Sequence, residues 1–449
     1  MFTGDLRSVQ WRSQATRLWG PTAVVLIAAV VIGLQITATG AGFVGPLRSL
    51  AGDYFGTPTS ATVPWVGLGV AMVGLSRRYR VWSLSVAVVL DVVLAVLRVA
   101  RGGAWTVGNG PLIVLTGLAV IVGWRRWARD EHSTALRGVA FGLLLVIATK
   151  VGDSWLRITA ILRPVVLDEY ALLADHALAQ PSWLLGRLLH AGGPVINAAF
   201  HWVYIELPVA AMVVAIYQLR NVSIGGWPRH FLIPTFLVLG LIGPLIYVFF
   251  PLVGPDFAFG SEGRGFEIGD FWPHAVPRIN LSPKAIAFDG STPRNCMPSM
   301  HTAWALAVFL HSRGGPRWLR MGGALWLTCT VAATLGFGYH YGVDLLAGGL
   351  LCLTVESALR EPVRDRVGRR IGMTAFGAAF LVALLVCCRY FAAEMARYAV
   401  PFGVLIIGTL VAFSAAFYVT YFARPAMPAE DRSLPVRGVF VRQGSSAVS

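Results

Sequence analysis

The sequence predicts an all-α membrane protein, a polytopic helical bundle with about twelve spans. Of its 449 residues 56% are hydrophobic and only 13% are charged, whereas soluble domains carry about 25% charged residues. Apolar runs near the roughly 20 residues that a helix needs to cross the hydrocarbon core recur along the whole chain. Together these observations indicate many spans rather than a single anchor.

The apolar runs divide the chain into four predicted parts. These are an N-terminal four-span extension, a six-span phosphatase-like core, two C-terminal spans and a disordered tail, at residues 1–130, 131–360, 361–421 and 422–449. Spans are predicted at 18–39, 60–76, 81–98, 105–124, 137–160, 194–219, 231–253, 298–312, 318–337, 341–359, 372–391 and 396–421. No internal repeat is evident in the sequence.

The basic residues predict which loops face the cytoplasm. The net charge is +15, but the arginines lie in short clusters between apolar runs, a pattern typical of membrane topology rather than nucleic-acid binding. Of the 37 Lys and Arg residues, 24 fall in alternate loops that include both termini. We therefore predict that both termini are cytoplasmic and that the loops 161–193 and 254–297 are outside. Only Lys150 and Lys284 are lysines, an arginine-rich usage that suggests a high-GC bacterium and hence its plasma membrane.

Three further features bear on the prediction, namely Asp91, the loop 161–193 and the cysteines. Asp91 lies inside a predicted span, where acids are costly and often functional, but Arg98 two turns later offers an ion pair. The loop 161–193 carries a leucine stripe, which predicts an amphipathic helix on the outer membrane surface. The five cysteines show neither a disulfide framework nor zinc-ligand spacing, so no metal is expected.

The first chemical motif is Pro298-Ser299-Met300-His301. Proline suits the first turn of a helix, which would place Ser299 and His301 where free N–H groups and the helix dipole favour an anion. Arg294, shortly before the motif, is expected to clamp a phosphate.

The second motif pairs His340 with Asp344. On one helix these residues would share a face, so the Asp344 carboxylate can accept from Nδ1 of His340 and leave Nε2 free to attack. The charge count places both histidines at outer helix ends, on the side away from ATP.

The two motifs resemble those of the type 2 phosphatidic acid phosphatase superfamily. The more similar branch contains the inositol phosphorylceramide synthases and their bacterial relatives, and the resemblance covers about residues 137–359. It implies that His340 is the nucleophile, that Asp344 orients it, that His301 is the general acid and that Ser299 binds phosphate. It also implies that neither a metal nor another cofactor takes part.

One departure from the family pattern bears on the reaction. The phosphatase branch has an arginine six residues before the nucleophile, where this chain has Thr334. The synthase branch also lacks that arginine, which favours transfer over hydrolysis. Lys150 and Arg157 resemble the family's first motif without its proline, and are candidates for phosphate binding. Lys150 could instead pair with Asp153.

The predicted function is a membrane phosphotransferase that moves an inositol phosphate or related head group. Its donor would be a phospholipid or polyprenyl phosphate, and its acceptor an alcohol. With water as acceptor the same site would make a lipid or polyprenyl phosphate phosphatase, and a non-catalytic transporter or scaffold is the alternative of another class. Additional pocket residues are expected at His201, Tyr204 and Glu206, where interface anchoring is the competing interpretation. The oligomeric state is not predicted.

Overall fold

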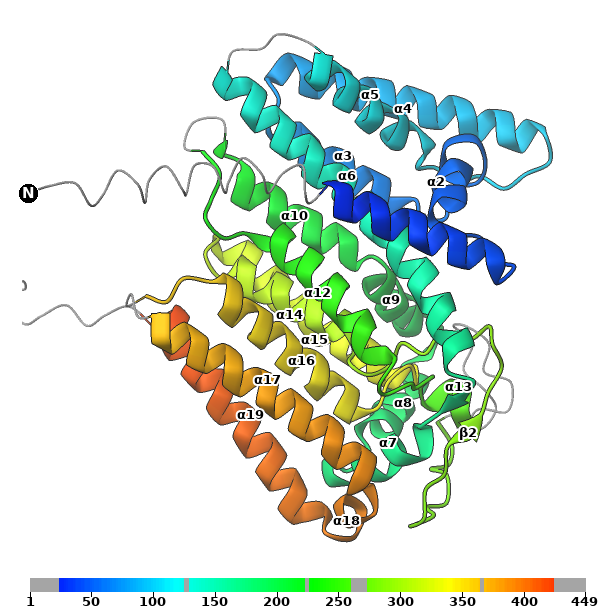
Figure 1. Ribbon diagram of the computed structural model, residues 1–449, viewed down its shortest axis with the longest axis vertical. Coiled ribbons are helices and arrows are strands. Elements are labelled where there is room, and N and C mark those ends of the chain that lie inside the picture. The colour runs from blue at the N-terminus through cyan, green and yellow to red at the C-terminus, as the bar shows by residue number, and fades with distance from the viewer. Residues whose placement is uncertain (1–23, 125–128, 223–225, 260–272, 364–366, 424–449) are drawn as a thin grey trace, which may run out of the picture.

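The computed structural model describes residues 24–124, 129–222, 226–259, 273–363 and 367–423. Its helices form one bundle with most axes running in a similar direction (Figure 1). The N-terminal helices lie at the top of the view and the C-terminal helices at the bottom (Figure 1). The predicted disordered tail, from residue 424 on, lies outside the described residues.

The N-terminal helices form the upper part of the bundle (Figure 1). They are Val24–Gly40, α2 (Pro46–Phe55), α3 (Thr62–Val73), α4 (Arg77–Ala100), α5 (Asn109–Trp124) and α6 (Arg129–Leu162).

The central helices α9 and α10 and α12 to α16 lie between them and the C-terminal pair, with the short elements gathered at one end (Figure 1). The short elements are β1 (Val165–Val166), α7 (Asp168–Asp175), η1 (His176–Leu178), α8 (Pro181–Ala191), α13 (Pro255–Phe259) and β2 (Ile286–Ala287). The longer helices are α9 (Gly193–Ile205), α10 (Leu207–Leu219), α12 (Leu232–Tyr247), α14 (Met300–Ser312), α15 (Arg317–Gly336) and α16 (Gly342–Leu359). The C-terminal elements are α17 (Val367–Tyr390), α18 (Ala392–Arg397) and α19 (Ala399–Tyr421).

Each predicted span overlaps a helix, or for 194–219 two helices, but the count of twelve spans is not confirmed. In the described residues five helices are long and apolar enough to cross a membrane, namely α4, α6, α16, α17 and α19. The pair α9 and α10, bent by 51°, makes a sixth if it is counted as one span. Others, such as α3 with 12 residues and α14 with 13, are shorter than a span requires. The chain is a multi-pass helical membrane protein.

Glycines let the N-terminal helices pack closely. Gly67 of α3 and Gly142 of α6 face each other, and a Cβ on either would overlap the backbone of the other helix. Small residues allow such close backbone approach between membrane helices. The packing matters because α3 and α6 also contact the central helices α10 and α12.

Asp91 has a structural environment, and the predicted ion pair with Arg98 is absent. The Asp91 carboxylate accepts from the backbone N–H groups of Gly108 and Gly110, at the start of α5, and from Trp65 Nε1. Arg98 instead donates to oxygens of Gly56, Thr106 and Asn109. The carboxylate satisfies the first amides of α5, which have no intrahelical acceptor.

The prediction of a surface helix in the loop 161–193 is wrong for α7, the first of the two helices that form there. Helix α7 is buried, with Asp168 and Asp175 fully inaccessible and its leucines packed in the main core. It contacts α16, α17 and α18, while α8 packs on α15. Strand β1 pairs with β2 and ties this loop to the second long loop. The leucines of α7 thus face protein, whereas Leu184 and Leu188 of α8 are 61% and 60% exposed, so for α8 the surface helix stays a prediction.

Candidate active site

His340 lies in the short connection between α15 and α16, with its side chain buried. Its Nδ1 atom is 3.4 Å from Oδ2 of Asp344. The two groups are therefore in contact, as predicted, although Nδ1 makes no hydrogen bond to a described residue, and the predicted shared helix is absent because α16 begins only at Gly342. Asp344 is the third residue of α16, and its Oδ2 also accepts from the N–H of Tyr341, which caps the helix. The Asp344 carboxylate thus caps the start of α16 and also contacts the imidazole of His340.

Two buried carboxylates of α7 support the segment that follows His340. Asp168 accepts from the Tyr341 hydroxyl and from the amides of Val253 and Gly254, and Asp175 accepts from the amide of Val343. Burial raises the pKa of Asp168 to about 7 and that of Asp175 to about 8. Both acids come from the loop that was expected on the membrane surface, so sequence reasoning missed their role.

Burial also affects His340 itself. It lowers the pKa of the imidazole to about 3, against the opposing effect of a hydrogen bond to the Cys296 backbone. The imidazole is therefore neutral at pH 7, as a nucleophile must be. Ser182 donates to the His340 carbonyl at 2.7 Å, and Cys296 Sγ donates to the Tyr339 carbonyl at 2.9 Å. These contacts fix the backbone on either side of the ring.

His301 lies in the first turn of α14, as predicted, but Pro298 precedes the helix instead of starting it. Ser299 is the N-cap and accepts from the Thr302 amide at 3.4 Å. The amides of Met300 and His301 come before the first helical hydrogen bond, from Ala303 to Ser299. They are donors at a helix N-terminus, where anions bind readily.

A close contact between α14 and α16 brings the two motifs together. The Ser299 amide donates to the Asp344 carbonyl at 3.0 Å. Gly348 faces the Ser299 backbone, and a Cβ at this position would overlap the Ser299 carbonyl. The glycine therefore permits the approach that sets the distance between His301 and His340.

Aromatic side chains hold the His301 ring. Tyr204 stacks on it with centroids 3.9 Å apart, and Trp304 approaches it edge-on at 6.3 Å. Of the other predicted pocket residues, His201 contacts the edge of Phe337, and Glu206 accepts from Thr62 of α3 at the bend between α9 and α10.

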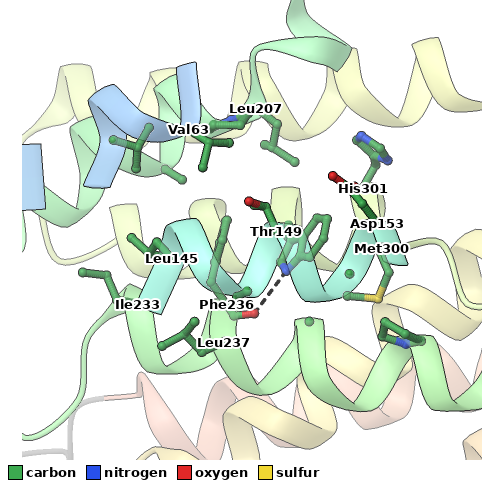
Figure 2. A pocket seen from close by; sticks show the side chains of 18 of the residues that line it. Val63, Leu145, Thr149, Asp153, Leu207, Ile233, Phe236, Leu237, Met300 and His301 are labelled. Carbon is green, nitrogen blue, oxygen red and sulfur yellow. Dashed lines mark hydrogen bonds between the residues drawn. The ribbon is translucent and has the colours of Figure 1, made fainter. Parts of the chain in front are cut away.

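A cavity of about 380 Å³ extends from the two histidines into the bundle. Most of its wall is apolar and comes from α3, α6, α10, α12 and α14. Figure 2 shows His301, Met300 and Asp153 at one end, and Val63, Leu145 and Ile233 toward the other. Its size is in the range of small-molecule sites, and its long apolar wall suits a hydrocarbon chain.

The basic residues predicted to bind phosphate do not line this cavity. Lys150 is buried in an ion pair with Asp53 of α2 at 2.5 Å, rather than with Asp153. The Arg294 guanidinium donates to the carbonyls of Arg163, Phe288, Asp289 and Thr292, so it braces the outer loop. Arg157 is exposed on α6. Thr334 is buried and donates to the Thr330 carbonyl.

Two groups of side chains have the residue types and spacing of metal ligands, although no such cluster is visible in the sequence. Cys296, His340 and Asp344 form one, and His230, His311 and Glu356, near the far ends of α14 and α16, form the other. In the second group Glu356 also accepts from Arg360 and Thr235. Its charge is thus already compensated by an arginine, which disfavours a dication.

Comparison with known families adds to this geometry. Residues 173–357 match the model of the PAP2 superfamily, and residues 17–158 match a model described as a domain of unknown function, DUF5933. The chain therefore contains a PAP2 superfamily domain, which includes His301, His340 and Asp344. No curated protein and no solved structure matches the chain. The domain and the membrane helices together support a membrane phosphatase or phosphotransferase type of function.

Proposed function

We propose that this protein is a membrane phosphotransferase that acts on a lipid phosphate or phosphodiester at the outer face of the plasma membrane. The observation that carries the proposal is the position of two histidines at one end of an apolar cavity. One of them has a carboxylate 3.4 Å from its Nδ1 atom. The cavity accommodates the lipid chain, and the histidines meet its phosphate.

The reaction proceeds by two displacements. Nε2 of His340 attacks phosphorus, the bond from phosphorus to the ester oxygen breaks, and protonated His301 gives its proton to the leaving alcohol. An acceptor hydroxyl then attacks the phosphohistidine, His301 takes the acceptor proton, and the bond from phosphorus to nitrogen breaks. Asp344 stabilises the positive charge that the His340 ring carries while it is phosphorylated.

The negative charge of the bound phosphate must be compensated by nearby donors or cations. The cavity-lining residues in the described part of the chain include no lysine or arginine. The free amides of Met300 and His301 at the start of α14 supply donors in their place. This lipid-phosphate site follows the resemblance to the inositol phosphorylceramide synthase branch, and Thr334, in place of an arginine, favours an alcohol over water as acceptor.

The test is to trap the intermediate. Full-length protein in detergent micelles is mixed with phosphatidic acid or polyprenyl phosphate labelled with ³²P, quenched in alkali and analysed for acid-labile label. We expect label on the wild type, slower labelling of His301→Ala because it lacks the acid that protonates the leaving alcohol, and no label on His340→Ala. His190→Ala is the matched control, because His190 is an exposed residue of α8. Equal labelling of His340→Ala would overturn the proposal.

The acceptor is tested separately. Wild-type protein is given inositol phospholipid and a panel of alcohols, and transferred product is measured beside free phosphate. Transferred product supports the phosphotransferase. Free phosphate alone, with every alcohol, would make the protein a phosphatase.

A further inference from the structure

One face of α6 belongs to the cavity. Thr149, Gly152, Asp153 and Leu156 recur at helical spacing and all line it. These residues lie within 17–158, the segment that matches the domain of unknown function. A residue of this segment, Asp153, therefore shares a cavity with His301 and His340 of the PAP2 domain.

Asp153 is the one carboxylate or other fully charged side chain among the described residues that line the cavity. It lies at the same end as His301 (Figure 2). Lys150, one turn earlier on α6, does not pair with it, because Lys150 pairs with Asp53 and also contacts Thr59. The buried Lys150–Asp53 ion pair connects α6 to α2. It fixes the orientation of α6 about its own axis, so that Asp153 rather than Lys150 faces the cavity.

Within the described part of the chain no residue donates a hydrogen bond to Asp153. An exposed carboxylate on the wall of this cavity is available to accept hydrogen bonds from a ligand. A phosphate is excluded as its partner, since it carries the same sign of charge. Asp153 is exposed and lies at the end of the cavity where His301 lies, so its carboxylate is open to a ligand there.

We infer that Asp153 binds the acceptor, as a hydrogen-bond acceptor for a hydroxyl group of a polyol. The inference rests on the proposed function and gives the segment 17–158 a role, because this segment supplies the acceptor side of the active site. Arg157, one turn along α6, brings positive charge near Asp153, so the ligand does not have to be a cation. Asp153 determines specificity and takes no part in bond breaking.

The experiment measures how often the phosphohistidine reacts with an alcohol rather than with water. Full-length protein receives labelled phosphatidic acid with glycerol, inositol or choline, and the ratio of transferred product to free phosphate is determined. For glycerol and inositol we expect Asp153→Asn to lower this ratio about tenfold and to raise the KM of the polyol, as expected for loss of one hydrogen bond to a charged group. Asp153→Glu should recover part of the ratio. A variant that is less active overall loses transfer and hydrolysis to the same extent, so the ratio of the two products does not change.

Glu131→Gln is the matched control, since it removes one carboxylate from the exposed start of the same helix. An unchanged ratio in Asp153→Asn, an equal fall in Glu131→Gln, or an equal loss with choline would overturn the inference. Absence of any polyol product in the wild type, with hydrolysis intact, would also overturn it. Absence of both lipid turnover and phosphoenzyme in the wild type would instead count against the proposed function.

Discussion

Asp344 Oδ2 lies 3.4 Å from His340 Nδ1 and at the same time accepts the Tyr341 amide at 2.8 Å. The catalytic pair and the start of α16 therefore share one oxygen atom. The position of the imidazole is coupled to the capping of the helix, and loss of the Asp344 side chain would affect both.

Asp344→Asn separates charge from geometry. The asparagine oxygen can keep the Tyr341 cap, but the negative charge that stabilises the phosphorylated imidazole is lost. We expect kcat to fall by about 10²–10⁴-fold with little change in melting temperature. Steady-state kinetics and a thermal unfolding scan measure these effects. Wild-type kcat in a folded variant would remove Asp344 from the mechanism.

Gly348→Ala should separate the two motifs. Its new methyl group would overlap the Ser299 carbonyl, so α14 and α16 must move apart at the site. We expect at least a tenfold loss of kcat and a lower melting temperature, as is usual for overpacking of a close contact. Gly349→Ala is the control, because a Cβ there meets no atom within 4 Å. Similar behaviour of the two variants would contradict the close-approach argument.

Lys150→Met tests whether this lysine is structural or binds phosphate. The change leaves Asp53 buried without its ion pair, which should lower the free energy of unfolding by about 3–5 kcal/mol. In the double variant Lys150→Met/Asp53→Asn, the buried charge is gone, and we expect stability and activity to return together. A stable but inactive double variant would instead restore the phosphate-binding role predicted from the sequence.

The two raised carboxyl pKa values predict that stability falls as the pH rises from about 6.5 to 8.5. Native Asp168 and Asp175, with pKa about 7 and about 8, keep protons that the unfolded chain has already lost, so stability falls with pH until these protons are released and then levels off. Histidine does not interfere, because the lowered pKa of His340 affects stability only below its ordinary value of about 6.5. Thermal unfolding across this range measures the slope, and Asp175→Asn should flatten it. A melting temperature that rises with pH would show the assigned sign to be wrong.

The helices were predictable because their signal is local. Apolar runs place the start and end of α4, α16 and α19 within a few residues of the prediction. The span count was not predictable in the same way. A run of apolar residues does not show where a helix ends early, as α3 and α12 do, or bends, as α9 and α10 do.

The candidate site residues also differ in how far their roles could be predicted from the sequence. His340 and Asp344 are four residues apart, so their pairing at 3.4 Å depends on a short stretch of backbone and could be predicted. The functions of Lys150 and Arg294 could not, because their partners Asp53 and Arg163 lie 97 and 131 residues away in the sequence. The burial of Asp168 and Asp175 likewise depends on how α7 docks on α16.

Composition and residue spacing alone thus determined the membrane class, the positions of the helices and the His340–Asp344 pair, because hydrophobicity and covalent distance are properties of short segments. Tertiary packing decided which face of α6 meets the cavity, which cations are already paired and how near His301 comes to His340. Those outcomes depend on contacts between distant segments, such as Gly348 with Ser299, whose complementarity is not visible in either segment by itself.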